Sequence, residues 1–306
     1  MNTLREDLNE YLAMRRALGF KLINAGKSLS QFVSYFEAQS AEFITTSMAV
    51  TWAQLAASAH SRAERLSFLR PFARFRSASD PRTEVPAENL FPYRPRRAQP
   101  YLYSEDEIRK LLKAAKALAN PFRAETFFCL LGLLSVTGLR IGEALELQLQ
   151  HVDLAEGVLT VEGAKHGKSR LVPLHDSTRD VLAAYKSCRE EFLNGQAASF
   201  FFISLNGTRL DRAMVHRTFY DLSRQIGLRK NGSSKGPRIH DFRHAFAVRT
   251  MLQWYRSGED VERRLPFLST YLGHVHVSDT YWYLTSVPEL MDLGVRLLER
   301  RWEEES

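Results

Sequence analysis

The chain has 306 residues, and its 42 Lys and Arg against 35 Asp and Glu give a formal net charge of +7. This length predicts two domains rather than one core, and the positive charge favours a polyanionic partner. No apolar run is long enough to span a membrane, the first residues lack the profile of a signal peptide, and the two cysteines, Cys129 and Cys188, suggest buried thiols in a reducing compartment. These features exclude the membrane-spanning and disulfide-rich secreted classes and predict a cytoplasmic protein.

Four helices are predicted in the first part of the chain. Apolar residues recur at helical spacing in three stretches, residues 5–19, 28–39 and 48–59. A fourth helix is predicted to open at Ser61, which forms a capping-box pattern with Glu64, and Pro71 should kink it because proline removes one helical hydrogen bond. Five arginines occupy the surface that its apolar stripe leaves, namely Arg62, Arg65, Arg70, Arg74 and Arg76. They form either a solvated face or, as we favour, contacts to the phosphates of a nucleic acid, because only Glu64 offers a counter-charge.

A basic, proline-rich stretch separates this part from the rest. Residues 91–100 hold three prolines and three arginines, Arg94, Arg96 and Arg97. Prolines favour an extended course and exclude a helix. We therefore expect a linker at residues 92–100, after a first domain at residues 1–91, and its arginines are candidate contacts to a nucleic-acid backbone.

The second part is predicted to be helical around one β-hairpin. Helices are predicted from residue 104 onward and at residues 122–136, 177–194 and 211–226. Residues 158–174 alternate and are rich in β-branched side chains, with His166-Gly167 at their centre, which indicates a hairpin. The sequence therefore predicts a mainly α fold with a small β-hairpin sheet.

Four short strings in the second part carry reactive side chains. They are Thr137-Gly138-Leu139-Arg140, the hairpin tip with Lys165, His240-Asp241-Phe242-Arg243, and Leu272-Gly273-His274 with Tyr283 nine residues beyond. Arginine offers a planar fork of donors that matches phosphate oxygens. Tyrosine can form a covalent intermediate, and histidine transfers protons near neutrality. This set is suited to breaking a phosphodiester without a metal.

The order Arg, Lys, His-x-x-Arg, His, Tyr is similar to that of the tyrosine recombinases (phage-type integrases), and the strings at residues 137–145 and 161–174 resemble theirs. The resemblance implies a helical, SAM-like DNA-clamp domain at residues 1–91 and a mixed α/β catalytic domain at residues 101–285. The sequence around Tyr283 also resembles recombinases of mobile elements, including those encoded in groups of three.

The resemblance implies six catalytic residues, namely Arg140, Lys165, His240, Arg243, His274 and Tyr283. Tyr283 would attack the scissile phosphate, form a 3′-phosphotyrosyl link and free a 5′-hydroxyl, with no ATP, metal or other cofactor. Two arginines and His274 would hold the phosphate oxygens, Lys165 would protonate the departing 5′ oxygen, and His240 would accept or donate a proton near the nucleophile. The implied partners are double-stranded DNA at specific recombination sites, other copies of the chain in a synaptic tetramer, and sister recombinases of the same element.

Several assignments within this set have alternatives. Lys168 competes with Lys165, because the hairpin tip is one residue longer than the commonest spacing, and it is otherwise a DNA contact. Glu143 either orients a neighbouring site group or is an ordinary acid of a first helical turn. Tyr281 lies two residues from Tyr283, about 200° around a helix, so the two cannot face one phosphate.

His244 follows His240 by four residues, a spacing that can bind zinc on a helix. Asp241 stands where a metalloprotease would carry glutamate, and no third ligand is evident. We therefore expect no metal, and interpret His244 as a residue that supports the site or packs beside it.

Two other functions share much of this pattern. A type IB topoisomerase is similar in the same reactive groups but reseals the same strand, and a DNA-binding accessory protein could carry an inactive site. The tail at residues 286–306 is predicted to be a helix whose apolar stripe is Leu290, Leu293 and Leu297. That stripe packs either on its own domain or, as we favour from the resemblance, on a neighbouring protomer.

Overall fold

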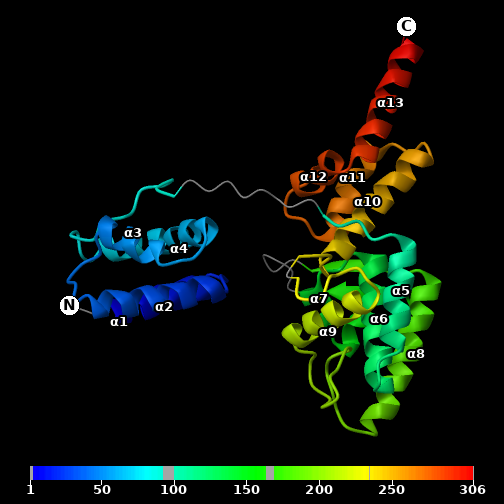
Figure 1. The fold of residues 1–306 in the computed structure, drawn as a ribbon, viewed down its shortest axis with the longest axis horizontal. Helices are drawn as coiled ribbons and strands as arrows, with labels where there is room; N and C mark the ends of the chain where they lie inside the picture. Colours follow the sequence, from blue (N-terminus) through cyan, green and yellow to red (C-terminus); the bar gives the residue numbers. More distant parts are fainter. Residues whose placement is uncertain (1–2, 92–99, 163–168, 234, 306) are drawn as a thin grey trace. The chain divides into compact units, whose positions relative to one another are not determined.

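The computed structural model describes residues 3–91, 100–162, 169–233 and 235–305. The chain divides into two compact units, Met1–Ala98 and Gln99–Ser306 (Figure 1). Mostly helical structure with one small antiparallel sheet confirms the predicted fold class. None of the helices in the described part of the chain is long and apolar enough to cross a membrane.

The N-terminal unit packs four helices, α1 (Leu4–Ala17), α2 (Ile23–Ala38), α3 (Thr46–Gln54) and α4 (Ala59–Ser77). Its core is largely aromatic, with the rings of Phe32 and Trp52 in edge-to-face contact at 5.0 Å, an arrangement that aromatic pairs prefer. Tyr11 of α1 packs against Phe72 of α4 with ring centroids 5.6 Å apart. These contacts join α1 to α4 and α2 to α3.

The start of α4 differs from the prediction. The helix begins at Ala59, and the side chain of Ser58, not Ser61, accepts the capping hydrogen bond, from the backbone N–H of Ser61 at 3.1 Å. Ser58 has the extended backbone that a capping residue needs, with φ −118° and ψ 151°. The expected capping box of Ser61 with Glu64 was therefore wrong, and the helix continues through Pro71.

The first part of the C-terminal unit packs helices and a small sheet around a hydrophobic core. Its first elements are α5 (Glu105–Lys116), α6 (Pro121–Thr137), α7 (Ile141–Glu146), η1 (Leu149–His151), β1 (Val152–Asp153), β2 (Val158–Val161), β3 (Arg170–Pro173), α8 (Asp176–Leu193) and α9 (Arg212–Gln225). Helix α6 is buried along most of its length and contacts α5, α8 and α10. This central position explains why its sequence is apolar on every side.

The sheet has the order β1-β2-β3, with both pairs antiparallel. Strands β2 and β3 form the predicted hairpin, in which Val158 pairs with Pro173 and Val161 with Arg170. The strand β1 was not predicted. Its two residues are too few to display the alternation that identifies a strand.

The last four helices surround a second hydrophobic cluster. They are α10 (Asp241–Arg256), α11 (Val261–Leu272), α12 (Ser278–Ser286) and α13 (Pro288–Glu305). Residues of all four contribute to the cluster, including Met251, Leu268, Tyr283 and Leu290. Helix α11 also contacts β3, so its C-terminal end lies next to the sheet.

Candidate active site

Arg140 follows a turn that requires glycine. Gly138 ends α6 with a left-handed φ of 62°, and a Cβ at this position would lie 2.7 Å from a ring carbon of Phe246. A larger residue would therefore be both strained and in collision. Arg140 has an extended backbone and is the residue that caps the start of α7, so the turn carries the chain from the buried end of α6 to the edge of the site.

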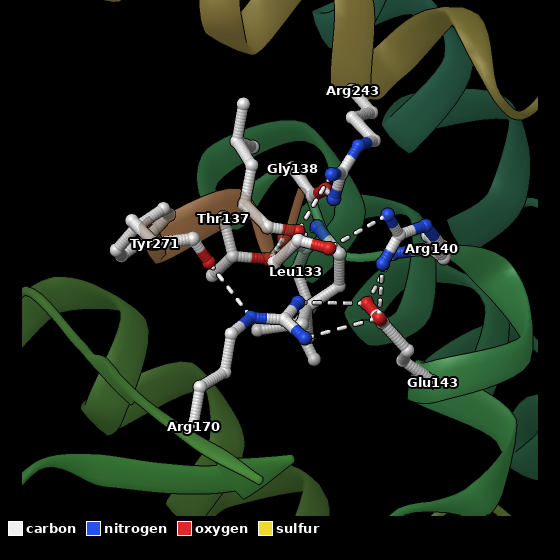
Figure 2. A network of polar contacts seen from close by, with 11 residues as sticks. Leu133, Thr137, Gly138, Arg140, Glu143, Arg170, Arg243 and Tyr271 are labelled. Carbon is white, nitrogen blue, oxygen red and sulfur yellow. Dashed lines mark hydrogen bonds and ion pairs between the residues drawn. The ribbon is translucent and has the colours of Figure 1, made fainter. Parts of the chain in front are cut away.

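Glu143 holds two arginines at once (Figure 2). Its Oε1 accepts from Nη1 of Arg140 at 2.7 Å and from Nη1 of Arg170 at 3.1 Å, and its Oε2 accepts from Nη2 of Arg170 at 2.8 Å. Its side chain is only 9% exposed. Burial opposes ionisation, but the hydrogen bonds and charge of Arg170, with the hydrogen bonds of Arg140, outweigh it and lower the pKa of Glu143 to about 2. The carboxylate is therefore charged at neutral pH.

The C-terminal end of α11 receives three guanidinium groups. The carbonyl of Tyr271 accepts from Arg170 Nε at 2.7 Å, that of Leu272 from Arg243 Nη2 at 2.6 Å, and that of Gly273 from Arg140 Nη2 at 3.0 Å. The last carbonyls of a helix lack partners within the helix and lie at the negative end of its dipole. Cations are therefore favoured at this end, and the arginines satisfy these carbonyls.

Arg243 is the most deeply placed of these arginines, at 2% exposed. Its Nη1 also donates to the carbonyl of Gly138 at 3.0 Å, so it joins the end of α6 to the end of α11. Burial and the charge of Arg140 lower the pKa of Arg243 to about 10. It remains a cation at neutral pH, which suits a group that stabilises phosphate charge.

Tyr283 lies inside the unit on α12, at 2% exposed, with its Oη 3.2 Å from Nδ1 of His244. The rings of Tyr283 and His274 stack with centroids 6.3 Å apart. Tyr281, by contrast, is 47% exposed. The two tyrosines therefore point in different directions, as their spacing on a helix predicts.

His274 and His244 are neutral at physiological pH. Burial, followed by the charges of Arg243 and Arg140, lowers the pKa of His274 to about 4. Burial, followed by the charge of His240, lowers the pKa of His244 to about 4. The Nδ1 of His274 lies 2.7 Å from Oγ1 of Thr280, and when that hydroxyl donates, the ring proton is on Nε2, which can then donate to a phosphate oxygen.

His240 lies beside this pair, its ring in edge-to-face contact with His244 at 4.8 Å. Part of its side chain remains at the surface. Partial desolvation and the nearby charge of Arg243 lower the pKa of its imidazole. His240 is therefore also poised to accept a proton.

The described contacts connect most of the predicted site. Arg140, Glu143, Arg243 and His274 surround the end of α11, and His240, His244 and Tyr283 form a second group joined to the first through the stacked rings of His274 and Tyr283. Lys165 and Lys168 lie outside the described residues, as do Arg94, Arg96 and Arg97 of the linker. Thr280, which sequence reasoning missed, contacts His274.

Arg170 is the other residue that sequence reasoning missed, although its string was part of the resemblance. A signal was present in the strand itself. Arg170 and Val172 are two residues apart, so they share one face of β3, and Val172 is completely buried. A charged residue on the inward face of a strand needs a partner, and Glu143 is that partner.

The arginines of α4 divide into three groups. Arg62, Arg65 and Arg70 donate to backbone carbonyls of Ala56, Trp52 and Pro86, respectively, while Arg74 is exposed. Arg76 is 8% exposed and forms ion pairs with Asp7 and, at 3.7 Å, with Asp80. The expected surface position of Arg76 was therefore wrong, because a carboxylate from α1 draws it into the core.

The family model described as the phage integrase family matches residues 102–289. A protein of Sinorhizobium fredii named "Putative integrase/recombinase y4rB" is 52% identical, with 99% of each chain covered. Tyrosine recombinase XerD of Caulobacter vibrioides is 33% identical over 72% of this chain and 69% of its own length.

Two solved structures share the fold. The Tn1549 transposon integrase in complex with transposon right end DNA matches with a TM-score of 0.69 and 16% identity, covering 98% of this chain and 99% of that one. A lambda integrase dimer bound to a COC′ core site matches with a TM-score of 0.59 and 22% identity, covering 92% and 77%.

Proposed function

Because the chain belongs to the phage integrase family and is a tyrosine recombinase, we propose that it cleaves and rejoins DNA at specific sites through a 3′-phosphotyrosyl intermediate on Tyr283. One observation carries this proposal. The Tyr283 phenol lies 3.2 Å from a neutral His244, and its ring stacks on His274, whose pKa is lowered by the charges of Arg243 and Arg140. A nucleophile, a proton acceptor and two phosphate-binding cations thus belong to one site.

The reaction needs no outside energy source. The oxygen of Tyr283 bonds to phosphorus, the bond from phosphorus to the 5′ oxygen breaks, and the leaving oxygen takes a proton. A 5′-hydroxyl from a partner duplex then attacks the phosphotyrosine and releases the tyrosine. Each step exchanges one phosphodiester for another, so the bond energy is retained and neither ATP nor a metal is required.

The described residues suit separate tasks in this chemistry. Arg140 and Arg243 stabilise the charge on the non-bridging oxygens, with His274 as a neutral donor beside them. His244, with its Nδ1 3.2 Å from the Tyr283 oxygen, can accept the Tyr283 proton, and by resemblance His240 also accepts or donates one. We assign protonation of the 5′ oxygen to Lys165 on the resemblance alone, with Lys168 as its competitor.

The proposed partners follow from the family and from the solved relatives. The lambda integrase and Tn1549 structures hold DNA, and another lambda integrase structure is a tetramer on a Holliday junction. We propose that this chain likewise binds recombination sites in duplex DNA as a tetramer, acts in the cytoplasm, and has sister recombinases of one mobile element as further partners. Residues 1–91 would clamp the duplex, and the tail at residues 286–306 would dock on a neighbouring protomer through its part beyond the buried Leu290.

A nicked suicide substrate tests this function directly. When the short product strand dissociates, the covalent complex is trapped and survives denaturant. We expect the wild-type protein to form this complex with or without EDTA, and Tyr283→Phe to bind the same DNA with unchanged affinity but form no complex. Tyr281→Phe is the matched control and should react normally.

The opposite pattern would contradict the assignment. A covalent complex that persists in Tyr283→Phe and disappears in Tyr281→Phe would move the nucleophile to the exposed tyrosine. If the wild-type protein forms no covalent complex on any DNA carrying the ends of its own element, the proposed reaction itself is wrong.

A further inference from the structure

Arg170 is the first residue of β3 and follows directly on the hairpin tip. It pairs with Val161 across the hairpin and lies five residues after Lys165 in the sequence. Its side chain leaves the sheet and extends to α7 and to the end of α11 (Figure 2). One residue therefore links the hairpin to two other parts of the site.

All three nitrogens of the Arg170 guanidinium are engaged within the protein. Nη1 and Nη2 bind the two oxygens of Glu143 at 3.1 and 2.8 Å, and Nε donates to the carbonyl of Tyr271 at 2.7 Å. The side chain is 9% exposed. A guanidinium held in this way by a bidentate pair has a fixed orientation, and its burial keeps it from a DNA phosphate, so we expect it to act through its neighbours.

The neighbour that matters is Arg140. Its own side chain is 32% exposed, and its Nη1 shares Oε1 of Glu143 with Arg170. The group of two arginines and one carboxylate carries a net charge of +1. Without Arg170, the single carboxylate would neutralise Arg140 and could take both of its forked nitrogens. The positive charge of Arg140 would then no longer be available to the scissile phosphate, although the side chain itself remained.

We propose that Arg170 is a positioning residue for strand cleavage, which by occupying Glu143 leaves the charge of Arg140 available to the scissile phosphate and ties the hairpin to the end of α11. This inference rests on the proposed function and adds a residue that the sequence motifs do not assign. Gly273 fits the same arrangement, since a Cβ there would lie 2.7 Å from Nη1 of Arg170.

A pair of substrates separates this electrostatic role from a structural one. The first carries an ordinary scissile phosphate and the second a methylphosphonate, in which a neutral methyl replaces one charged oxygen. The rate of covalent-complex formation is measured for each under single-turnover conditions with enzyme in excess. Loss of charge stabilisation slows the phosphate reaction selectively, because the uncharged substrate needs less of it.

We expect Arg170→Met to slow cleavage of the phosphate substrate by about 10- to 100-fold, by analogy with the loss of residues that orient metal ligands. Most of that loss should disappear on the methylphosphonate, as it should for Arg140→Ala. Arg170→Lys keeps the charge, so its rate on the phosphate substrate should fall less than that of Arg170→Met. DNA affinity should stay close to that of wild type for both variants, because the Arg170 side chain is only 9% exposed.

Arg189 provides the matched control. It is 2% exposed and donates to the carbonyls of Ala198 and Phe200, so its loss affects the fold and not the site. Arg189→Met should slow both substrates by the same factor. If Arg170→Met behaves in this way, or cleaves the phosphate substrate at the wild-type rate, the proposal is wrong.

A second variant decides the matter if Arg170→Met fails to fold. Glu143→Gln removes the carboxylate that would neutralise Arg140, so Arg170→Met combined with Glu143→Gln should cleave the phosphate substrate about as fast as Glu143→Gln alone. A double variant that cleaves the phosphate substrate much more slowly than Glu143→Gln alone would overturn the proposal. Wild-type cleavage in the same assay shows that the proposed function holds, whichever result Arg170 gives.

Discussion

Glu143 stays ionised in a place where burial alone would favour its neutral form. The two arginines that it binds hold its pKa at about 2, so its charge persists at any pH at which the protein would work with DNA. The histidines of the site behave in the opposite way. His244 and His274 have pKa values of about 4 against an ordinary 6.5, because burial and nearby cations disfavour their charged forms.

These histidines predict how the stability of the C-terminal unit depends on pH. Between about pH 6.5 and pH 4 the unfolded chain binds protons that the folded site rejects, so the free energy of unfolding must fall as pH falls through this window. Above it the contribution is fully present. We expect the melting temperature to decrease over this range and the decrease to become smaller in His244→Gln and in His274→Gln.

Differential scanning calorimetry at constant ionic strength measures this effect. His276 is exposed and lies outside the buried part of the site, so His276→Gln serves as the control. A melting temperature whose slope in this window is the same in wild type and in both site variants would contradict the prediction.

The role assigned to Lys165 can be tested with a substrate whose leaving group needs little protonation. A 5′-bridging phosphorothiolate leaves as a thiol with a pKa of about 8.5, so it needs little protonation. Lys165→Ala should strongly reduce the rate of cleavage of ordinary DNA and should recover most of that rate on the sulfur substrate. Arg140→Ala should not recover, because it removes charge stabilisation, on the order of 10²- to 10³-fold in rate for one donor. If the rate of Lys168→Ala recovers on the sulfur substrate and that of Lys165→Ala does not, Lys168 is the residue that protonates the 5′ oxygen.

At the scale of elements, α4 carries two arginines with different environments. Arg76 is buried with Asp7 and Asp80, whereas Arg74 is exposed. Replacing Arg76 by Met leaves the Asp7 carboxylate buried without this partner, which should lower the free energy of unfolding by about 3–5 kcal/mol. Arg74→Ala should change it by less than about 0.5 kcal/mol but weaken DNA binding and reduce the slope of log K against log salt by about 1.

Urea unfolding followed by far-ultraviolet circular dichroism measures the first pair of effects, and binding isotherms at several salt concentrations measure the second. Equal destabilisation by the two substitutions would show that the burial of Arg76 contributes nothing. An unchanged salt slope in Arg74→Ala would remove that residue from the proposed DNA surface.

The helices were predictable because their periodic apolar residues reflect which side is buried, and that pattern depends on no distant part of the chain. Their ends were less predictable. Ser58 and Ser61 both suit a helix start, and the choice between them depends on the backbone path of the preceding loop. Arg76 was misplaced for a related reason, since its position depends on Asp7, 69 residues away.

The same distinction applies to the site. Groups that a short motif carries, such as His240 with Arg243, could be named as candidates from the sequence. The link from Arg170 to Glu143 was not, because it joins a strand to a helix 27 residues away, and neither residue indicates its partner. The contacts of the arginines with the end of α11 were equally hidden, since they involve backbone atoms.

At the scale of the whole molecule, α13 has two different parts. Val287, just before the helix, and Leu290 are 6% and 1% exposed and belong to the cluster that also contains Tyr283. Farther along the helix, Met291, Val295 and Trp302 are 55%, 52% and 66% exposed. The beginning of the tail therefore packs on its own unit, and the exposed part is the candidate for docking on a neighbouring protomer.

A truncation after Gly294 tests this proposal, because it retains Val287 and Leu290. We expect the shortened protein to keep its melting temperature within a few degrees, to bind one DNA site normally, and to lose the pairing of two sites and recombination. Native gels with two labelled duplexes measure pairing. Val295→Ser is a milder companion variant and should reduce pairing in the same direction. If the shortened protein pairs and recombines at the full rate, the tail has no docking role, and a monomer that reseals the same strand becomes the better description.

The arginine contacts also bear on what related sequences can reveal. Four hydrogen bonds from Arg140, Arg170 and Arg243 end on main-chain oxygens, those of Gly138, Tyr271, Leu272 and Gly273. Any residue supplies such an oxygen, so correlated substitution in an alignment would report the pairs with Glu143 and miss these four. The two glycines are the exception, because their left-handed φ and the atoms that a Cβ would meet restrict them to glycine. In an alignment of relatives, we therefore expect glycine to be invariant at positions 138 and 273, and no covarying pair to report these four hydrogen bonds.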